Sequence, residues 1–159
     1  MRRGYSMNRH SGIFLALALL AIAAATPARA DRCDDLAKQL TGQVDGLSVG
    51  RTAANVIYLS HPAAKQVRLG CASRRVSNEF YAAVDSRKPQ PAFANMVASA
   101  AAIIFTIPKP DTLKGVNRCI GRMGIFRGDD VKLRYRRLDL RCTRTKTSAT
   151  ITISRGKDE

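Results

Sequence analysis

The sequence has no tryptophan, and its aromatic residues make up only 6% of 159 residues. Acidic residues are also scarce, with 12 Asp and Glu against 27 Lys and Arg, which gives a formal net charge of +15. Glu79 is the only glutamate before the C-terminal residue. A glycosidase needs two carboxylates facing one sugar, and a calcium loop needs several oxygen ligands at defined spacing. Neither pattern is present, so we predict no catalytic carboxylate pair, no metal site and no cofactor.

Histidine and paired cysteine motifs are missing as well. Downstream of residue 30 the only histidine is His61, and Ser60 beside it would point to the opposite face of a strand. A nucleophile and its base need hydrogen-bond reach and a third group that orients the base. No C-x-x-C spacing suggests a zinc or thioredoxin-like site. We therefore expect a protein that is not an enzyme, and keep as the alternative an enzyme or enzyme inhibitor that uses His61 and Glu79.

The N-terminus has the three parts of a secretory signal peptide. Residues 1–12 contain three arginines and no acid, residues 13–25 are an unbroken apolar run, and an Ala-x-Ala sequence ends at Ala30. The apolar run is shorter than the roughly 20 residues that a membrane-spanning helix needs. We predict a signal peptide over residues 1–30, cleaved after Ala30, and a periplasmic or secreted protein with no transmembrane span after cleavage. Its start is open between Met1 and Met7.

The predicted mature chain, residues 31–159, is long enough to bury one core as a single domain. An even number of cysteines in an exported protein is typical of disulfides, which here would number two. Four cysteines allow three connectivities, and shorter loops close more readily. The sequence therefore favours the pairs Cys33–Cys71 and Cys119–Cys142. Loops of these lengths should each contribute on the order of 3–4 kcal/mol of stability.

Hydrophobic periodicity predicts an α+β domain. Apolar residues recur at helical spacing over about 33–45 and 111–123, and residues 92–107 form a charge-free helix, which is typical of a buried one. Short β-branched or alternating runs over 47–52, 55–60 and 66–71 predict two or three antiparallel strands. Residues 73–84 fit a helix or a strand, and we favour a fourth strand because helix capping there is poor. With a C-terminal hairpin, these make a single antiparallel sheet of about five strands, with one short N-terminal helix and two central helices packed on one face.

The C-terminal stretch carries the clearest strand pattern. From Val131 to Arg136, apolar and cationic residues alternate, and after Arg137 the alternation slips by one position. Because a one-residue slip would turn later side chains to the wrong face, we predict a bulge near Arg136–Arg137. A second alternating run over 149–155 completes the hairpin. One face of this hairpin would be apolar, and the other would carry cations.

The cations of this hairpin are the predicted anion-binding residues, because arginine can bind phosphates and carboxylates bidentately. They are Lys132, Arg134, Arg136, Arg141, Arg144 and Lys146. The simpler explanation is an edge hairpin whose outward charges prevent strand-to-strand aggregation. We expect a small binding or interaction module for an anionic envelope component or an acidic protein. We do not expect nucleic acid, because an exported protein seldom meets it and aromatic stacking partners are few. The third alternative is a purely structural or stress-related envelope protein.

Overall fold

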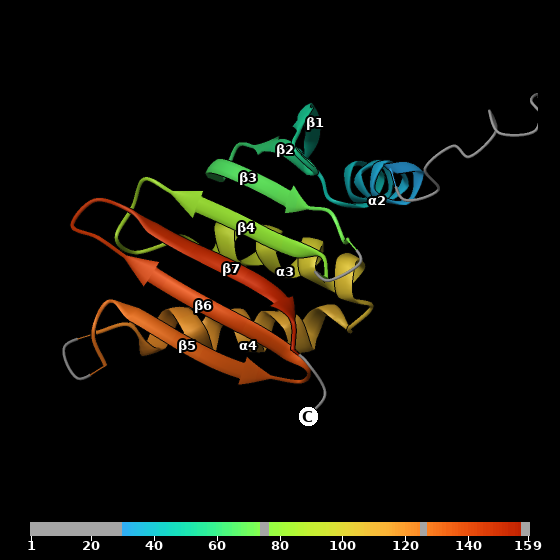
Figure 1. Ribbon diagram of the computed structural model, residues 1–159. Helices are drawn as coiled ribbons and strands as arrows, with labels where there is room; N and C mark the ends of the chain where they lie inside the picture. The colour runs from blue at the N-terminus through green and yellow to red at the C-terminus, as the bar shows by residue number, and fades with distance from the viewer. Residues whose placement is uncertain (1–29, 74–76, 125–126, 157–159) are drawn as a thin grey trace, which may run out of the picture.

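The computed structural model describes residues 30–73, 77–124 and 127–156 (Figure 1). Residues 1–29 of the predicted signal peptide lie outside this range, so the predicted leader stays a prediction. The elements in chain order are α2 (Ala30–Gln43), β1 (Ser48–Ala53), β2 (Val56–His61), β3 (Ala64–Gly70), β4 (Glu79–Val84), α3 (Pro91–Phe105), α4 (Lys109–Arg122), β5 (Asp130–Tyr135), β6 (Leu138–Arg144) and β7 (Ala149–Arg155). The described residues thus form three helices and one sheet.

The sheet has seven antiparallel strands in the order β1-β2-β3-β4-β7-β6-β5. Two sets of consecutive strands, β1–β4 and β5–β7, lie side by side and are joined where β4 pairs with β7. The helices α3 and α4 connect the two sets and lie behind the sheet in Figure 1. The predicted α+β class, single antiparallel sheet and C-terminal hairpin are confirmed. The predicted number of about five strands is wrong.

The predicted bulge is instead a tight turn, which accounts for one of the additional strands. Tyr135 and Leu138 are paired across β5 and β6, so only Arg136 and Arg137 connect the strands. Both residues have positive φ, 47° and 62°, as a type I′ two-residue turn requires. Such a turn reverses the chain and shifts the apolar alternation by one position. The alternation cannot distinguish this turn from a bulge, and two arginines do not signal it, because Asn-Gly is the usual type I′ pair.

The core lies between the sheet and the helices. Its largest fully buried side chains include Phe80, Ile151 and Ile153 from the centre of the sheet, and Phe93 and Val97 from α3. Eight residues of α3 are buried, which confirms that the charge-free segment is a core helix. It packs against α2 and α4 in the same layer. One face of the sheet is therefore covered by helices.

Both predicted disulfides are present. Cys33–Cys71 ties α2 to the end of β3, and Cys119–Cys142 ties α4 to β6. Their Cα atoms lie 5.7 Å and 6.0 Å apart, within the ordinary range for a disulfide. Each bond joins a helix to the sheet. The disulfides thus hold the helical layer to the sheet at two separate places.

Candidate anion-binding site

The sheet face opposite the helices carries a continuous row of polar side chains, and we call this face the open face. Successive residues of a strand point to opposite faces, so the neighbours of buried residues such as Leu69 and Phe80 lie on it. The strand register places one residue of each strand side by side across it. From β3 to β5 this row is Arg68, Tyr81, Thr152, Arg141 and Lys132.

A hollow of about 750 Å³ lies over this row, and we call it the trough. Its lining is Arg68, Glu79, Tyr81, Lys132, Leu133, Arg134, Asp139, Leu140, Arg141, Thr152 and Ser154. The short side chains of Thr152 and Ser154 come from β7, which is flanked on both sides by longer side chains from β3, β4, β5 and β6. A ligand in the trough would therefore lie on hydroxyl groups between two groups of charged side chains.

Arg68 is held in the trough by an aromatic ring. Its guanidinium carbon lies 4.0 Å from the centroid of the Tyr81 ring, on the neighbouring strand. This cation–π contact leaves the charge of Arg68 without a carboxylate within 4.0 Å among the described residues. The Nε atom is buried and has no hydrogen-bond partner there. Arg68 is thus an oriented cation whose charge no described carboxylate neutralises.

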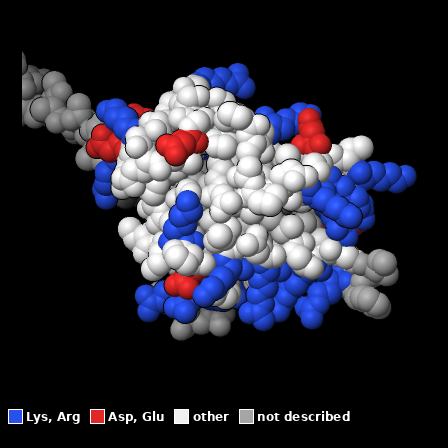
Figure 2. All heavy atoms as spheres, turned by 180° about the vertical axis from the view of Figure 1, so that it is seen from behind, with Lys and Arg blue, Asp and Glu red and all other residues white. Residues whose placement is uncertain are grey.

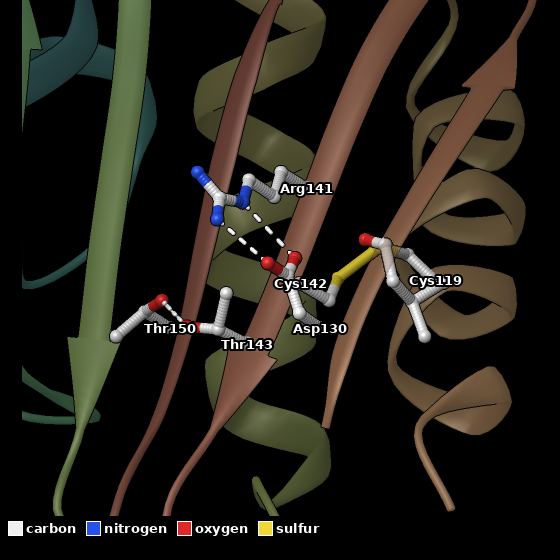
Figure 3. Close-up of a disulfide and its surroundings, with 7 residues drawn as sticks. Cys119, Asp130, Arg141, Cys142, Thr143 and Thr150 are labelled. Atoms are coloured by element: carbon white, nitrogen blue, oxygen red, sulfur yellow. Dashed lines mark hydrogen bonds and ion pairs between the residues drawn. A yellow bond between two sulfur atoms is a disulfide. The ribbon is translucent and has the colours of Figure 1, made fainter. Parts of the chain in front are cut away.

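Arg141 is oriented by a carboxylate instead (Figure 3). Its Nε and Nη2 atoms donate to the two oxygens of Asp130 at 3.0 Å and 2.6 Å. These hydrogen bonds, together with the positive charges of Arg141 and Lys132, hold the pKa of Asp130 below its ordinary value. The same bonds raise the pKa of Arg141. The next residue, Cys142, points to α4 through its disulfide, which shows how adjacent residues of β6 serve opposite faces.

Three of the six predicted anion-binding residues line the trough, namely Lys132, Arg134 and Arg141. Lys132 has no carboxylate within 4.0 Å in the described part of the chain. Arg134 lies 3.8 Å from Asp139, with 47% of its side chain exposed. From the predicted set, the trough therefore receives one lysine and two arginines that already contact acids, in addition to Arg68.

The other three predicted residues lie elsewhere, so the six cations do not form one row. Arg136 occupies the β5–β6 turn, where its Nε is 3.7 Å from Asp111 of α4. Lys146 lies between β6 and β7. Arg144 donates to Asp129 at 2.6 Å, and its side chain is only 15% exposed. The sequence pattern placed Arg136 on the strand face of Lys132 and Arg134 because it did not reveal the turn after Tyr135, whereas Arg144 and Lys146 were expected near the turn that precedes β7.

Asp129, just before β5, forms ion pairs with two arginines, Arg144 and Arg87. Besides Arg144, it accepts a hydrogen bond from Arg87 at 3.4 Å. The hydrogen bond from Arg144 is the main cause that lowers the pKa of Asp129, and the charge of Arg87 adds to it. Arg87 also donates to the carbonyl of Thr145 at 3.0 Å. These contacts give Arg144 and Arg87 structural roles.

Arg68 and Tyr81 are not among the residues predicted for the site. A signal was available, because Arg68 stands between Val67 and Leu69 in a predicted strand and Tyr81 follows Phe80. The alternation places both on the polar side of their strands. What the sequence lacked was the order of strands, which brings β3 and β4 next to the C-terminal hairpin.

The two residues considered for an enzyme lie apart. The Nδ1 atom of His61 accepts a hydrogen bond from the Ala63 amide, and Nε2 lies 3.0 Å from the carbonyl oxygen of Asp45. The His61 ring therefore links the β2–β3 turn to the segment after α2. Glu79 instead begins β4 and lines the trough. Among residues 30–73, 77–124 and 127–156, no group of three or more His, Cys, Asp and Glu could hold a metal ion.

The opposite side of the molecule, covered by helices, has a different distribution of charge. Figure 2 shows an uncharged central surface, with Lys and Arg gathered along the lower border, where α4 and β5 lie in Figure 1. Lys114 and Arg118 of α4 are exposed. They provide cations of the same types as Lys132 and Arg68, on an element that covers the other face of the sheet.

No protein-family model, curated protein or solved structure matches this chain. No helix in the described ranges is long and apolar enough to cross a membrane. The functional assignment therefore depends on the chemistry of the site itself.

Proposed function

We propose that this chain is an exported, non-catalytic binding protein whose open face binds an anionic component of the cell envelope. The observation that carries the proposal is the trough, in which the cations of Arg68 and Lys132 lack carboxylate partners in the described structure. Export is supported by the predicted signal peptide and by the two disulfides, which persist in oxidising compartments.

The cations of the trough are arranged before any ligand arrives. Tyr81 orients the guanidinium of Arg68, and Asp130 orients that of Arg141. With adjacent strands about 4.8 Å apart, the backbones of these two arginines are separated by three strand spacings, or about 14 Å. An anionic group over β7 would be approached from both sides by side chains that lose little conformational freedom on binding.

Protection against aggregation does not explain this arrangement. Outward cations do protect edge strands, and Lys132 lies on β5 at the edge of the sheet. Arg68 lies on β3, however, which is paired on both sides by β2 and β4. An interior strand has no free edge to protect. A binding role accounts for both residues, whereas edge protection accounts for one.

The proposal is tested by removing the two cations from the trough. The double variant Arg68→Gln with Lys132→Gln is compared with Lys114→Gln with Arg118→Gln, which removes one arginine and one lysine from α4. The probes are polygalacturonate, polyphosphate and phosphatidylglycerol vesicles, each at low and high salt. We expect the unsubstituted protein to bind at least one probe at low salt, with binding that weakens as salt screens the charges. The trough variant should lose this binding, and the α4 variant should keep it.

Two results would overturn the proposal. One is the absence of binding to all three probes at low salt. The other is an equal loss of binding in the two double variants, which would mean that the net positive charge attracts anions without a site. Circular dichroism and thermal unfolding of both variants check that the fold is retained.

A further inference from the structure

The trough is not uniformly basic, and its two ends differ in charge. The row through Thr152 contains Arg68, Arg141 and Lys132. The next row on the open face runs through Ser154, which is paired with Glu79 on one side and Asp139 on the other. Two residues along a strand span about 6.8 Å. Asp139 is in turn paired with Arg134, so this second row holds two carboxylates and one cation, whereas the charged lining residues of the first row are all cations. The two rows lie about 6.8 Å apart.

A ligand that is only an anion would not suit this lining. Glu79 and Asp139 would repel it, which partly offsets the attraction of the cations. Asp139 is 3.8 Å from Arg134, whereas Glu79 has no ion pair among the described residues. The carboxylate of Glu79 is a strong hydrogen-bond acceptor that forms no side-chain hydrogen bond among the described residues, and it is exposed to the trough.

The two rows together suit a ligand that is anionic at one end and hydroxylated at the other. Carboxylates accept hydrogen bonds from hydroxyl groups, and the hydroxyls of Thr152 and Ser154 can both donate and accept. A sugar acid has this combination, because its carboxylate and its ring hydroxyls lie at opposite sides of one ring. The separation of the rows is comparable with the length of such a ring and its carboxyl substituent.

We infer that the trough binds a uronate unit of an acidic polysaccharide. This inference rests on the proposed function and assigns the class of its ligand. The sugar carboxylate lies at the row of Arg68, Arg141 and Lys132, while the ring hydroxyls donate to Glu79 and contact Ser154. Arg134 keeps the charge of Asp139 partly compensated, so Glu79 is the main acceptor for the hydroxyls.

The effect of removing Glu79 distinguishes this inference from simple attraction between opposite charges. Binding of a short oligogalacturonate, its methyl ester and tripolyphosphate is measured by calorimetry at low salt. For Glu79→Ala, we expect affinity for the oligogalacturonate to fall about tenfold, equivalent to about 1.4 kcal/mol, because a charge-assisted hydrogen bond is lost. Affinity for tripolyphosphate should stay the same or rise, because a repulsive charge has been removed. The methyl ester, which lacks the carboxylate, should bind at least tenfold more weakly than the oligogalacturonate.

The matched control is Asp34→Ala, which removes one exposed acid from α2 and should leave both affinities nearly unchanged. The inference is overturned if Glu79→Ala strengthens oligogalacturonate binding, or if tripolyphosphate binds the unsubstituted protein as tightly as the sugar acid does. The proposed function survives either result as long as the Arg68→Gln and Lys132→Gln double variant loses anion binding. If no anionic probe binds at all, the proposed function itself has failed.

Discussion

The turn between β5 and β6 places two arginines in a backbone conformation that glycine adopts more easily, so a glycine there should stabilise the protein. Arg137 has φ of 62°, and a residue with a Cβ atom loses roughly 1–2 kcal/mol in this left-handed region. Its carbonyl accepts a hydrogen bond from the amide of Gly156 at 2.9 Å, which a substitution of the side chain would preserve. Replacing Arg137 by Gly therefore removes strain without removing a side-chain hydrogen bond or ion pair to any residue that the structure describes.

The expected gain is smaller than the strain that is relieved. Glycine makes the unfolded chain more flexible, at a cost of about 0.5–1 kcal/mol relative to alanine. The difference leaves Arg137→Gly more stable than Arg137→Ala by about 0.5–1 kcal/mol, or about 2–4 °C in Tm. Arg137→Ala is the matched control, because it removes the same charge and side chain but keeps the strained backbone.

Urea and thermal unfolding of the oxidised protein measure this difference. Lys132→Gly, in the interior of β5, should have the opposite sign and lower the free energy of unfolding by about 0.5–1 kcal/mol. If Arg137→Gly is no more stable than Arg137→Ala, the residue is not held at positive φ. The assignment of a type I′ turn, and with it the division of this stretch into two strands, would then be wrong.

Three further predictions concern the core, the Cys119–Cys142 disulfide and the dependence of stability on pH in acid. Thr112→Val should cost about 1 kcal/mol in urea unfolding, because the buried hydroxyl of Thr112 donates to a carbonyl of α3 at 2.9 Å. Replacing Cys119 and Cys142 together by Ala should lower stability on the order of 3 kcal/mol, with a control in which the unsubstituted protein is reduced. Arg141 lowers the pKa of Asp130 in the folded state. The ionised carboxylate of Asp130 therefore stabilises the fold above the ordinary Asp pKa of about 3.9, and this stabilisation is lost as pH falls through the lower pKa of the folded state. Asp130→Asn should therefore flatten the decline of the urea midpoint below about pH 5, and an unchanged slope would contradict this.

Local pattern was sufficient for much of the fold. The charge-free segment over 92–107 predicted a buried helix, since a helix without a polar face has no side to turn to water. Alternating or β-branched runs predicted two or three strands within 47–71, and poor helix capping favoured the strand that is β4 within 73–84. The preference for short loops also predicted both disulfides. These features depend on residues close together in the chain, or on the entropy of closing a loop, and both can be obtained from the sequence.

The tertiary structure alone decided which side chains share the candidate site. Pairing of β4 with β7 places Arg68 and Tyr81 beside the hairpin of Arg141, and no local pattern indicates which strands become neighbours. The positive φ of Arg136 removed that residue from the predicted row of cations, because alternation alone does not distinguish a turn from a bulge. The sequence by itself determined which face of each strand is polar. The order of the strands determined which polar residues meet, because it depends on how distant segments bury a common core.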